Sequence, residues 1–120
     1  MHDAGKTLAA FYDGVARKDI GAARKYLDPN LIFVGLFETY RSAEQYLTAL
    51  TGLLQIVRRL EVKTIIAQGE DAAIFFELET TAPAAAITLV AEWHQFRDGK
   101  IVHVRSAFDG RPFEAMFTKK

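Results

Sequence analysis

Two ionisable side chains late in the sequence are suited to acid/base chemistry. Glu92 and His94 lie two residues apart in a run of apolar and β-branched residues that is typical of a strand. Alternate residues of a strand share one face, so both side chains would point to the same side of a sheet. A carboxyl group buried without a cation keeps its proton to higher pH and can donate a hydrogen bond to a carbonyl or an enolate. The pair therefore predicts an acid at Glu92 and a base or hydrogen-bonding partner at His94.

Each of these residues also has a purely structural interpretation. Glu92 could lie at the rim of a pocket or pair with Arg105 of a neighbouring strand, and His94 could be a half-exposed strand residue. Ser106, His94 and Asp109 could be written as a nucleophilic triad. Free choice of three residues from a sequence always yields such a set, so this one carries little weight.

The turn after this run decides which residues share a face, and two turns are compatible with the sequence. A two-residue turn at Asp98-Gly99 would put His94 opposite His103 and gather the charges on one face. A three-residue loop with Gly99 in the left-handed region would instead pair Phe96 with Lys100. A shift of one residue sends every side chain to the other face.

The periodicity upstream predicts helices first and strands afterwards. Apolar residues at helical spacing begin at Leu8, Asp19 can cap a short second helix, and Ser42-Ala43-Glu44-Gln45 has the form of a capping box before a third. Strands are predicted over 31–37, 60–68, 71–81, 86–97 and 100–109, where the period changes to two. Three helices and a meander of strands indicate a single α+β domain over residues 1–120.

Composition excludes several classes of partner and cofactor. Fifteen basic and fifteen acidic residues leave no net charge, which argues against a nucleic-acid partner. There is no cysteine, and His2, His94 and His103 lack the spacing of metal ligands, so we predict no metal. The absence of a glycine-rich phosphate loop argues against a nucleotide cofactor. No apolar stretch is long enough to span a bilayer, and a cytoplasmic location is the expectation.

Several local strings, in this order, resemble the nuclear transport factor 2-like superfamily, in particular its SnoaL-like and ketosteroid isomerase-like domains. They are Phe11-Tyr12 with Asp19-Ile20, Tyr26-Leu27-Asp28-Pro29-Asn30, Tyr40-Arg41-Ser42, and Phe96-Arg97-Asp98-Gly99-Lys100-Ile101 leading to Phe108-Asp109. The resemblance implies a cystatin-like order α-α-β-α-β-β-β-β, in which a curved antiparallel sheet forms a cone covered by three helices. It also favours the three-residue hairpin, because that register turns Glu92 toward the pocket.

Carried over residue by residue, the resemblance supports only part of a catalytic site. The place of the isomerase's catalytic aspartate falls at or beside Gly35, with Glu38 the nearest carboxylate, and the place of its first-helix tyrosine falls on Phe11, beside Tyr12. The second acid of the isomerase corresponds to Glu92. Asp109 stands where SnoaL-like cyclases have an acid/base aspartate. The resemblance therefore implies Glu92 and Asp109 as catalytic candidates, and the alternation of the strand adds His94.

In this superfamily the residues of the core also line the pocket. The implied ligand-binding residues are Tyr12, Phe33, Phe76, Val104, Ser106 and Phe108. We predict a protein that binds a small apolar molecule, with cofactor-free isomerisation, dehydration or cyclisation of a carbonyl compound as the first interpretation. The alternative is a non-catalytic binding or dimerisation module of the same fold. Trp93 is expected on the outer sheet face, where it would lie in a homodimer interface.

Overall fold

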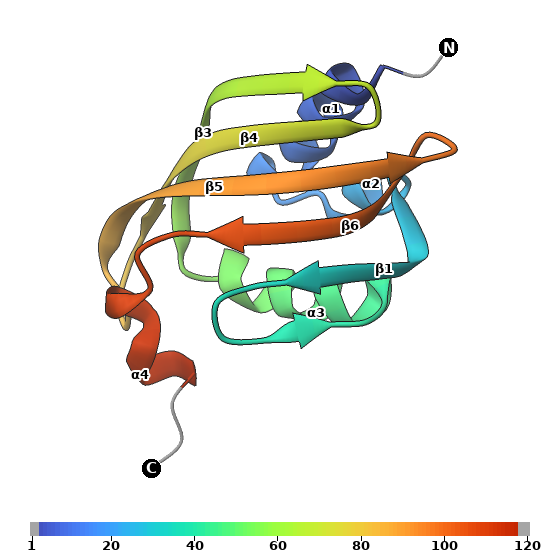
Figure 1. Cartoon of the computed structure of the whole chain (residues 1–120). Helices are drawn as coiled ribbons and strands as arrows, with labels where there is room; N and C mark the ends of the chain where they lie inside the picture. The colour runs from blue at the N-terminus through green and yellow to red at the C-terminus, as the bar shows by residue number, and fades with distance from the viewer. Residues whose placement is uncertain (1–2, 118–120) are drawn as a thin grey trace.

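The computed structural model describes residues 3–117, and Figure 1 shows how their helices and strands follow one another. The described elements are α1 (Ala4–Ala16), α2 (Ile20–Arg24), β1 (Leu27–Val34), β2 (Thr39–Tyr40), α3 (Ala43–Leu54), β3 (Val57–Gln68), β4 (Asp71–Thr80), β5 (Ala86–Arg97), β6 (Lys100–Ala107), a 3₁₀ turn (Arg111–Phe113) and α4 (Glu114–Phe117). The predicted α+β class and the order of its helices and long strands are confirmed. The short β2 and the C-terminal α4 were not predicted.

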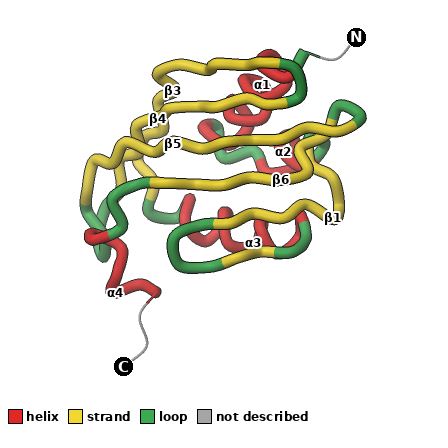
Figure 2. Tube along the Cα trace, in the orientation of Figure 1, coloured by secondary structure: helices red, strands yellow, loops and turns green. Residues whose placement is uncertain are grey.

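Within residues 3–117, six strands form one sheet in the order β2-β1-β6-β5-β4-β3. The sheet is mixed, because β1 pairs with β6 in parallel whereas the other four strand pairs, β1–β2, β3–β4, β4–β5 and β5–β6, are antiparallel. The prediction of a wholly antiparallel sheet is therefore wrong at one pair. The parallel pair arises because β1 is separated from the later meander by α3 and enters the sheet beside its last strand. Figure 2 shows the strands as one layer with the helices against it.

The helices begin where the sequence places capping side chains. The carboxylate of Asp19 accepts from the backbone N–H of Ala22, and the hydroxyl of Ser42 accepts from that of Gln45, both at 3.0 Å. The Gln45 side chain reaches back to the backbone N–H of Arg41 rather than to that of Ser42, so the capping box closes one residue earlier than expected.

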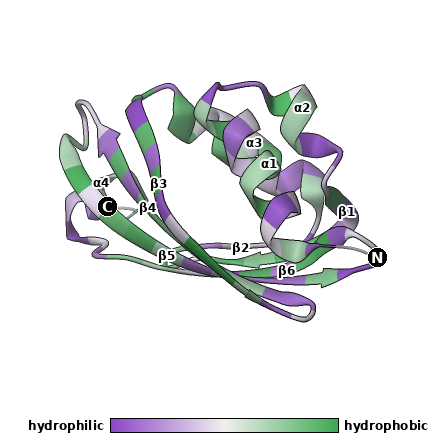
Figure 3. Cartoon of the chain, turned by 90° about the horizontal axis from the view of Figure 1, so that it is seen from above, coloured by the Kyte–Doolittle hydropathy of each residue, from purple (hydrophilic) through white to green (hydrophobic). Residues whose placement is uncertain are grey.

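The helices α1, α2 and α3 lie over the concave face of the curved sheet, as the view from above in Figure 3 shows. The predicted apolar face of α1 points into this space, where Leu8, Phe11, Tyr12 and Val15 are all buried. Full burial of one such side chain stabilises a fold by about 1.5–3 kcal/mol, so this row fixes α1 against the sheet. The core thus occupies the half of the sheet that the helices cover.

The turn between β5 and β6 has two residues, with Arg97 opposite Lys100. Asp98 and Gly99 both have positive φ, 53° and 77°, as a turn that matches the twist of its strands requires. The left-handed Gly99 was predicted correctly. The three-residue loop with Phe96 opposite Lys100 was wrong.

A bulge directly after this turn restores the predicted face. Gln95 lies opposite His103 and Phe96 opposite Ile101, which leaves Val102 as the extra residue. His94 is consequently opposite Val104, and its pairing with His103 does not occur. The one-residue insertion turns the following part of β6 over, so Val104 and Ser106 share the inner side with Glu92 and His94.

Candidate functional site

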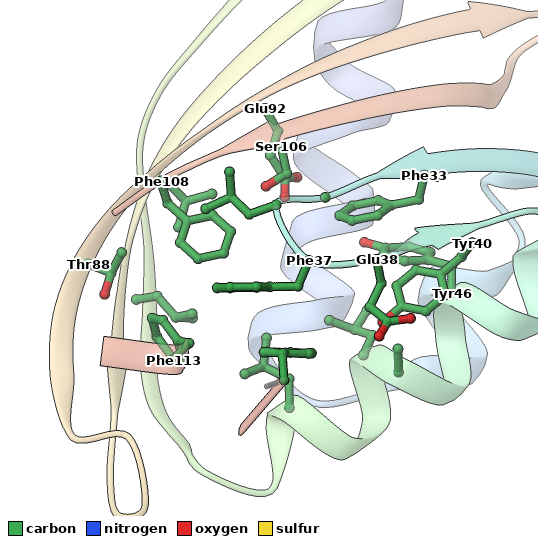
Figure 4. A pocket seen from close by; sticks show the side chains of 18 of the residues that line it. Phe33, Phe37, Glu38, Tyr40, Tyr46, Thr88, Glu92, Ser106, Phe108 and Phe113 are labelled. Carbon is green, nitrogen blue, oxygen red and sulfur yellow. The ribbon is translucent and has the colours of Figure 1, made fainter. Parts of the chain in front are cut away.

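A pocket of about 160 Å³ lies between the inner face of the sheet and α3. The β1–β2 loop and the C-terminal segment contribute to the same lining. Figure 4 shows that its walls are mainly aromatic and that Glu92 and Ser106 bring oxygen atoms to one side. Of the predicted ligand-binding residues, the lining includes Tyr12, Phe33, Phe76, Ser106 and Phe108.

Glu92 is the buried acid of this pocket, with 7 % of its surface exposed. It lies on β5 directly opposite Ser106 of β6, and its carboxylate Oε1 accepts a hydrogen bond from the hydroxyl of Tyr12 on α1. Burial raises the pKa of Glu92 from 4.5 to about 7, although hydrogen bonds from Tyr12 and Ser106 to the carboxylate oppose the shift. Near neutral pH the group is therefore divided between acid and carboxylate.

His94 lies behind Glu92 rather than in the pocket. Its side chain is fully buried, and its Nε2 is 3.4 Å from the Tyr12 hydroxyl oxygen and 3.5 Å from Oε1 of Glu92. Burial lowers the pKa of His94 from 6.5 to about 3, and the backbone of Glu92 opposes this only in part. The imidazole is therefore neutral at physiological pH, and the contact with Glu92 is not an ion pair.

Two tyrosines complete the polar cluster around Glu92. Burial, followed by the charge of Glu92, raises the pKa of both Tyr12 and Tyr46 well above the ordinary tyrosine value, and the two hydroxyl groups also interact with each other. Both phenols consequently keep their protons and act as hydrogen-bond donors. Tyr12 is held in place by edge-on contacts with the rings of Phe11 and His94, at 4.9 and 5.7 Å between centroids.

Stacked rings form two walls of the pocket. Phe33 of β1 stacks on Tyr46 of α3 with centroids 4.6 Å apart, and Phe37 stacks on Phe117 of α4 at 4.7 Å with the rings nearly parallel. Flat walls of this kind favour a planar or cyclic apolar ligand. The Phe37–Phe117 pair joins the β1–β2 loop to the C-terminal helix, so it also limits the size of the space between them.

Three predicted site residues do not line the pocket. His94 and Val104 face inward but are packed in the helix-covered core, with 0 % and 1 % exposure. Asp109 lies in the loop after β6, where its carboxylate pairs with the Arg111 guanidinium at 2.7 Å, and Arg111 lowers the pKa of Asp109 to about 2. The expectation that Asp109 lines the site is not met, because a local partner two residues away holds it on the surface.

The sequence interpretation missed Tyr46, Glu38 and the C-terminal phenylalanines Phe113 and Phe117 as pocket residues. In the sequence, Tyr46 shows only the apolar spacing of its helix. The ring on which it stacks, Phe33, belongs to a different element, β1. Glu38 lies in the β1–β2 loop with an exposed side chain, so the pocket contains a second carboxylate in addition to Glu92. No periodic signal marks the C-terminal residues.

Among residues 3–117, no group of three or more His, Cys, Asp or Glu side chains is placed to hold a metal ion. His2 lies outside the described residues. No helix in the described part of the chain is long and apolar enough to cross a membrane. Outside the pocket, Trp93 lies on the outer sheet face with 47 % exposure, as predicted, and its indole N–H donates to Asp71 at 2.9 Å.

Comparison with known proteins agrees with this architecture. A protein from Kribbella flavida superposes with a TM-score of 0.85 at 20% identity, over 93% of this chain and 91% of that one. TerC, co-crystallised with polyporic acid, gives 0.79 at 20% identity over 93% and 95% of the two chains. An LEH-like epoxide hydrolase of M. tuberculosis gives 0.76 at 19% identity over 95% and 88% of the two chains.

At these identities the structural likeness shows the fold alone. No curated protein matches the sequence. The sequence does match the SnoaL-like domain over residues 8–104, which is most of the chain. Together with the nuclear transport factor 2-like architecture, this match means that the chain belongs to the family of SnoaL-like domains.

Proposed function

We propose that this protein binds a small, largely apolar molecule whose carbonyl oxygen, or a similar acceptor, lies against Glu92. The observation that carries the proposal is a carboxyl group in an aromatic pocket whose pKa is raised to about 7 by burial. In its protonated form this group donates a hydrogen bond into a space that has few other polar groups. A carbonyl compound would satisfy that donor, whereas a hydrocarbon would leave it without a partner.

The size of the pocket limits the ligand. An apolar cavity of about 150 Å³ in another protein binds benzene. The pocket here has a similar volume, about 160 Å³, so a molecule with one ring fits without rearrangement. A larger ligand requires the stacked pair of Phe37 and Phe117 to separate.

The same arrangement supports cofactor-free acid/base catalysis. Glu92 would donate its proton, or a strong hydrogen bond, to the carbonyl oxygen as a base removes a proton from the adjacent carbon, giving an enol. The exposed carboxylate of Glu38, which also lines the pocket, is the available base. Isomerisation, dehydration and aldol-type cyclisation all proceed through such an enol.

A second candidate is a binding module without catalysis. It is favoured by the positions of His94 and Asp109, the two predicted bases, because one is sealed in the core and the other is paired with Arg111 at the surface. Glu38, the other carboxylate that residues 3–117 contribute to the pocket lining, belongs to a loop rather than to a rigid strand or helix.

A matched pair of ligands tests the binding proposal. Cyclohexanone and methylenecyclohexane have nearly the same shape, and only the ketone accepts a hydrogen bond. By NMR titration at pH 5 the ketone should bind more tightly than the hydrocarbon, and this preference should fade as pH rises through about 7 and Glu92 ionises. In Glu92→Gln the ketone affinity should not depend on pH. Equal affinities of the two ligands for the wild type at pH 5 would refute the proposal.

Hydrogen exchange separates catalysis from binding. If Glu38, which is exposed to solvent, removes the proton, the enzyme should exchange the α-hydrogens of the bound ketone for deuterium in D₂O faster than buffer alone does. NMR of the ketone measures this rate, and Glu92→Gln and Glu38→Gln should each reduce it. Binding with no accelerated exchange in the wild type would favour the non-catalytic module.

A further inference from the structure

The hydrogen bonds behind Glu92 have a direction that fixes where its acid proton lies. Tyr12 has a single hydroxyl proton. Near its oxygen are Oε1 of Glu92, which accepts that proton, Nε2 of His94 at 3.4 Å, and the hydroxyl group of Tyr46. The Tyr12 hydroxyl cannot donate to Glu92 and to His94 at once. Either His94 donates to Tyr12, or it competes with Glu92 for the tyrosine proton.

The other nitrogen of the ring decides between these arrangements. Nδ1 of His94 is buried and has no hydrogen-bond partner of good geometry among residues 3–117. If the proton were on Nδ1, the buried N–H would have at best the backbone of Glu92 nearby, without a hydrogen bond of good geometry, and Nε2 would also need the proton that Tyr12 gives to Glu92. With the proton on Nε2, that N–H reaches the Tyr12 oxygen, Tyr12 reaches Glu92, and only the bare Nδ1 lacks a partner.

We propose that His94 is a positioning residue, a neutral ring protonated at Nε2 that donates to Tyr12, so that Tyr12 donates to Oε1 of Glu92 and the proton of the acid is held on Oε2. The carbonyl oxygen of a carboxylic acid is its better acceptor, so an Oε1 that accepts from Tyr12 leaves the hydroxyl at Oε2. The acid proton is then directed away from the core, toward Ser106 and the pocket (Figure 4).

The surroundings of His94 support a fixed neutral ring. On the sheet its cross-strand neighbours are Ala72 and Val104, which are apolar, and the groups that titrate near it are Tyr12 and Glu92. The hydroxyl groups of Tyr46 and Tyr12 also interact with each other, which ties Tyr12 to α3. Within residues 3–117, the carboxyl group in contact with the ring is that of Glu92, whose burial favours its own neutral form.

The inference rests on the proposed role of Glu92, but its test requires no ligand. Nitrogen-15 NMR of the imidazole ring distinguishes a protonated nitrogen from a bare one in the intact wild-type protein. We expect Nε2 protonated and Nδ1 bare from pH 5 to pH 8. A ring protonated at Nδ1, or at both nitrogens in this range, would overturn the proposal whether or not any ligand binds.

Two variants test the effect on Glu92, whose titration is followed at its side-chain carboxyl carbon. His94→Leu removes the donor behind Tyr12, which weakens Tyr12 as a donor to the carboxylate, so the midpoint of Glu92 should rise by roughly a few tenths of a pH unit. If His94 were instead an acceptor, its removal would free the Tyr12 proton for Glu92, and the midpoint should fall by about one pH unit or more. His94→Gln, which keeps an N–H near the position of Nε2, should restore the wild-type midpoint. A lower Glu92 midpoint in His94→Leu than in the wild type would refute the proposal, and so would a Glu92 midpoint in His94→Gln equal to that in His94→Leu. If the leucine variant does not fold, the nitrogen-15 spectrum of the wild type decides the matter.

Discussion

Tyr12 and Glu92 are 80 residues apart in the sequence, yet the hydroxyl of one donates to the carboxylate of the other inside the protein. This bond joins α1 to the middle of β5 and connects the core under the helices with the open part of the pocket. It makes Tyr12 both a core residue and a group that sets the acidity of Glu92. The predictions below concern this bond, the pocket walls and the outer face of the sheet.

The Tyr12 hydroxyl stabilises the ionised form of Glu92, so its removal should make Glu92 a weaker acid. In Tyr12→Phe the pKa of Glu92 should rise by about 1–2 units above the wild-type value, because a hydrogen bond to a charged group contributes about 1.5–3 kcal/mol. Carbon-13 NMR titration of the Glu92 carboxyl group measures the change. Tyr46→Phe, which removes a hydroxyl that does not contact the carboxylate directly, is the matched control and should shift the midpoint less. An unchanged or lower midpoint in Tyr12→Phe would count against the hydrogen bond.

The raised pKa of Glu92 predicts that its contribution to stability declines with increasing pH. The unfolded chain releases this proton near pH 4.5 and the folded one near 7, so between these values the unfolded state binds fewer protons. The folded state therefore loses stability as pH rises through this window, by roughly 3 kcal/mol in total. Glu92→Gln should not show this loss, so its stability relative to the wild type should increase from pH 4.5 to pH 7.

Urea unfolding of the two proteins at several pH values measures this difference, in which contributions from other groups cancel. Glu38→Gln, which removes an exposed carboxyl group of the same pocket, is the control and should follow the wild type. A difference between Glu92→Gln and the wild type that does not depend on pH would mean that Glu92 titrates in the folded protein as it does in water.

The stacked pair of Phe37 and Phe117 should set the upper size of the ligand. Phe117→Ala removes one ring of the pair, so bicyclic ketones should gain affinity relative to cyclohexanone in this variant. NMR or calorimetric titration of both ligands gives the ratio of affinities. Met116→Ala, a truncation at the neighbouring exposed position outside the pocket lining, should leave the ratio unchanged. Equal ratios in Phe117→Ala and the wild type would show that the pair does not restrict the pocket.

We propose that the outer face of the sheet forms a homodimer interface. Trp93, Ile87 and Leu89 of β5 are exposed there by 47 %, 65 % and 60 %, which is a large apolar area for a free surface. Trp93→Arg should convert the dimer to a monomer in analytical ultracentrifugation, whereas Trp93→Phe should retain it. A wild type that sediments as a monomer would refute this proposal.

The sequence predicted the main elements because each carries a local signal. The apolar spacing on α1, the caps at Asp19 and Ser42 and the Asp98-Gly99 turn all act between residues close in the chain. The parallel pairing of β1 with β6 and the bulge at Val102 are not local in this sense. An extra residue in a strand leaves the alternation of apolar residues on either side nearly intact, so the bulge could not be placed from the sequence.

The candidate site was predicted in part for a similar reason. Alternation along β5 gives the face on which Glu92 and His94 lie, but it does not give their depth beneath the helices. The position of α1 decides this, because its Tyr12 covers His94 while Glu92 reaches the open part of the pocket. Asp109 was misplaced because the resemblance gave its position in the fold, whereas its nearby partner Arg111 determines where the side chain is held.

The cluster of Glu92 and His94 also means that folding changes the protonation of the two groups in opposite directions. Between pH 4.5 and 6.5 the unfolded chain carries a protonated imidazole and an ionised carboxylate at these two positions, whereas the folded protein, with pKa values of about 3 and about 7, holds both groups neutral. The total number of protons bound by these two groups is therefore the same in the unfolded and the folded state. At these two residues, a zwitterion in water becomes an uncharged pair in the folded protein.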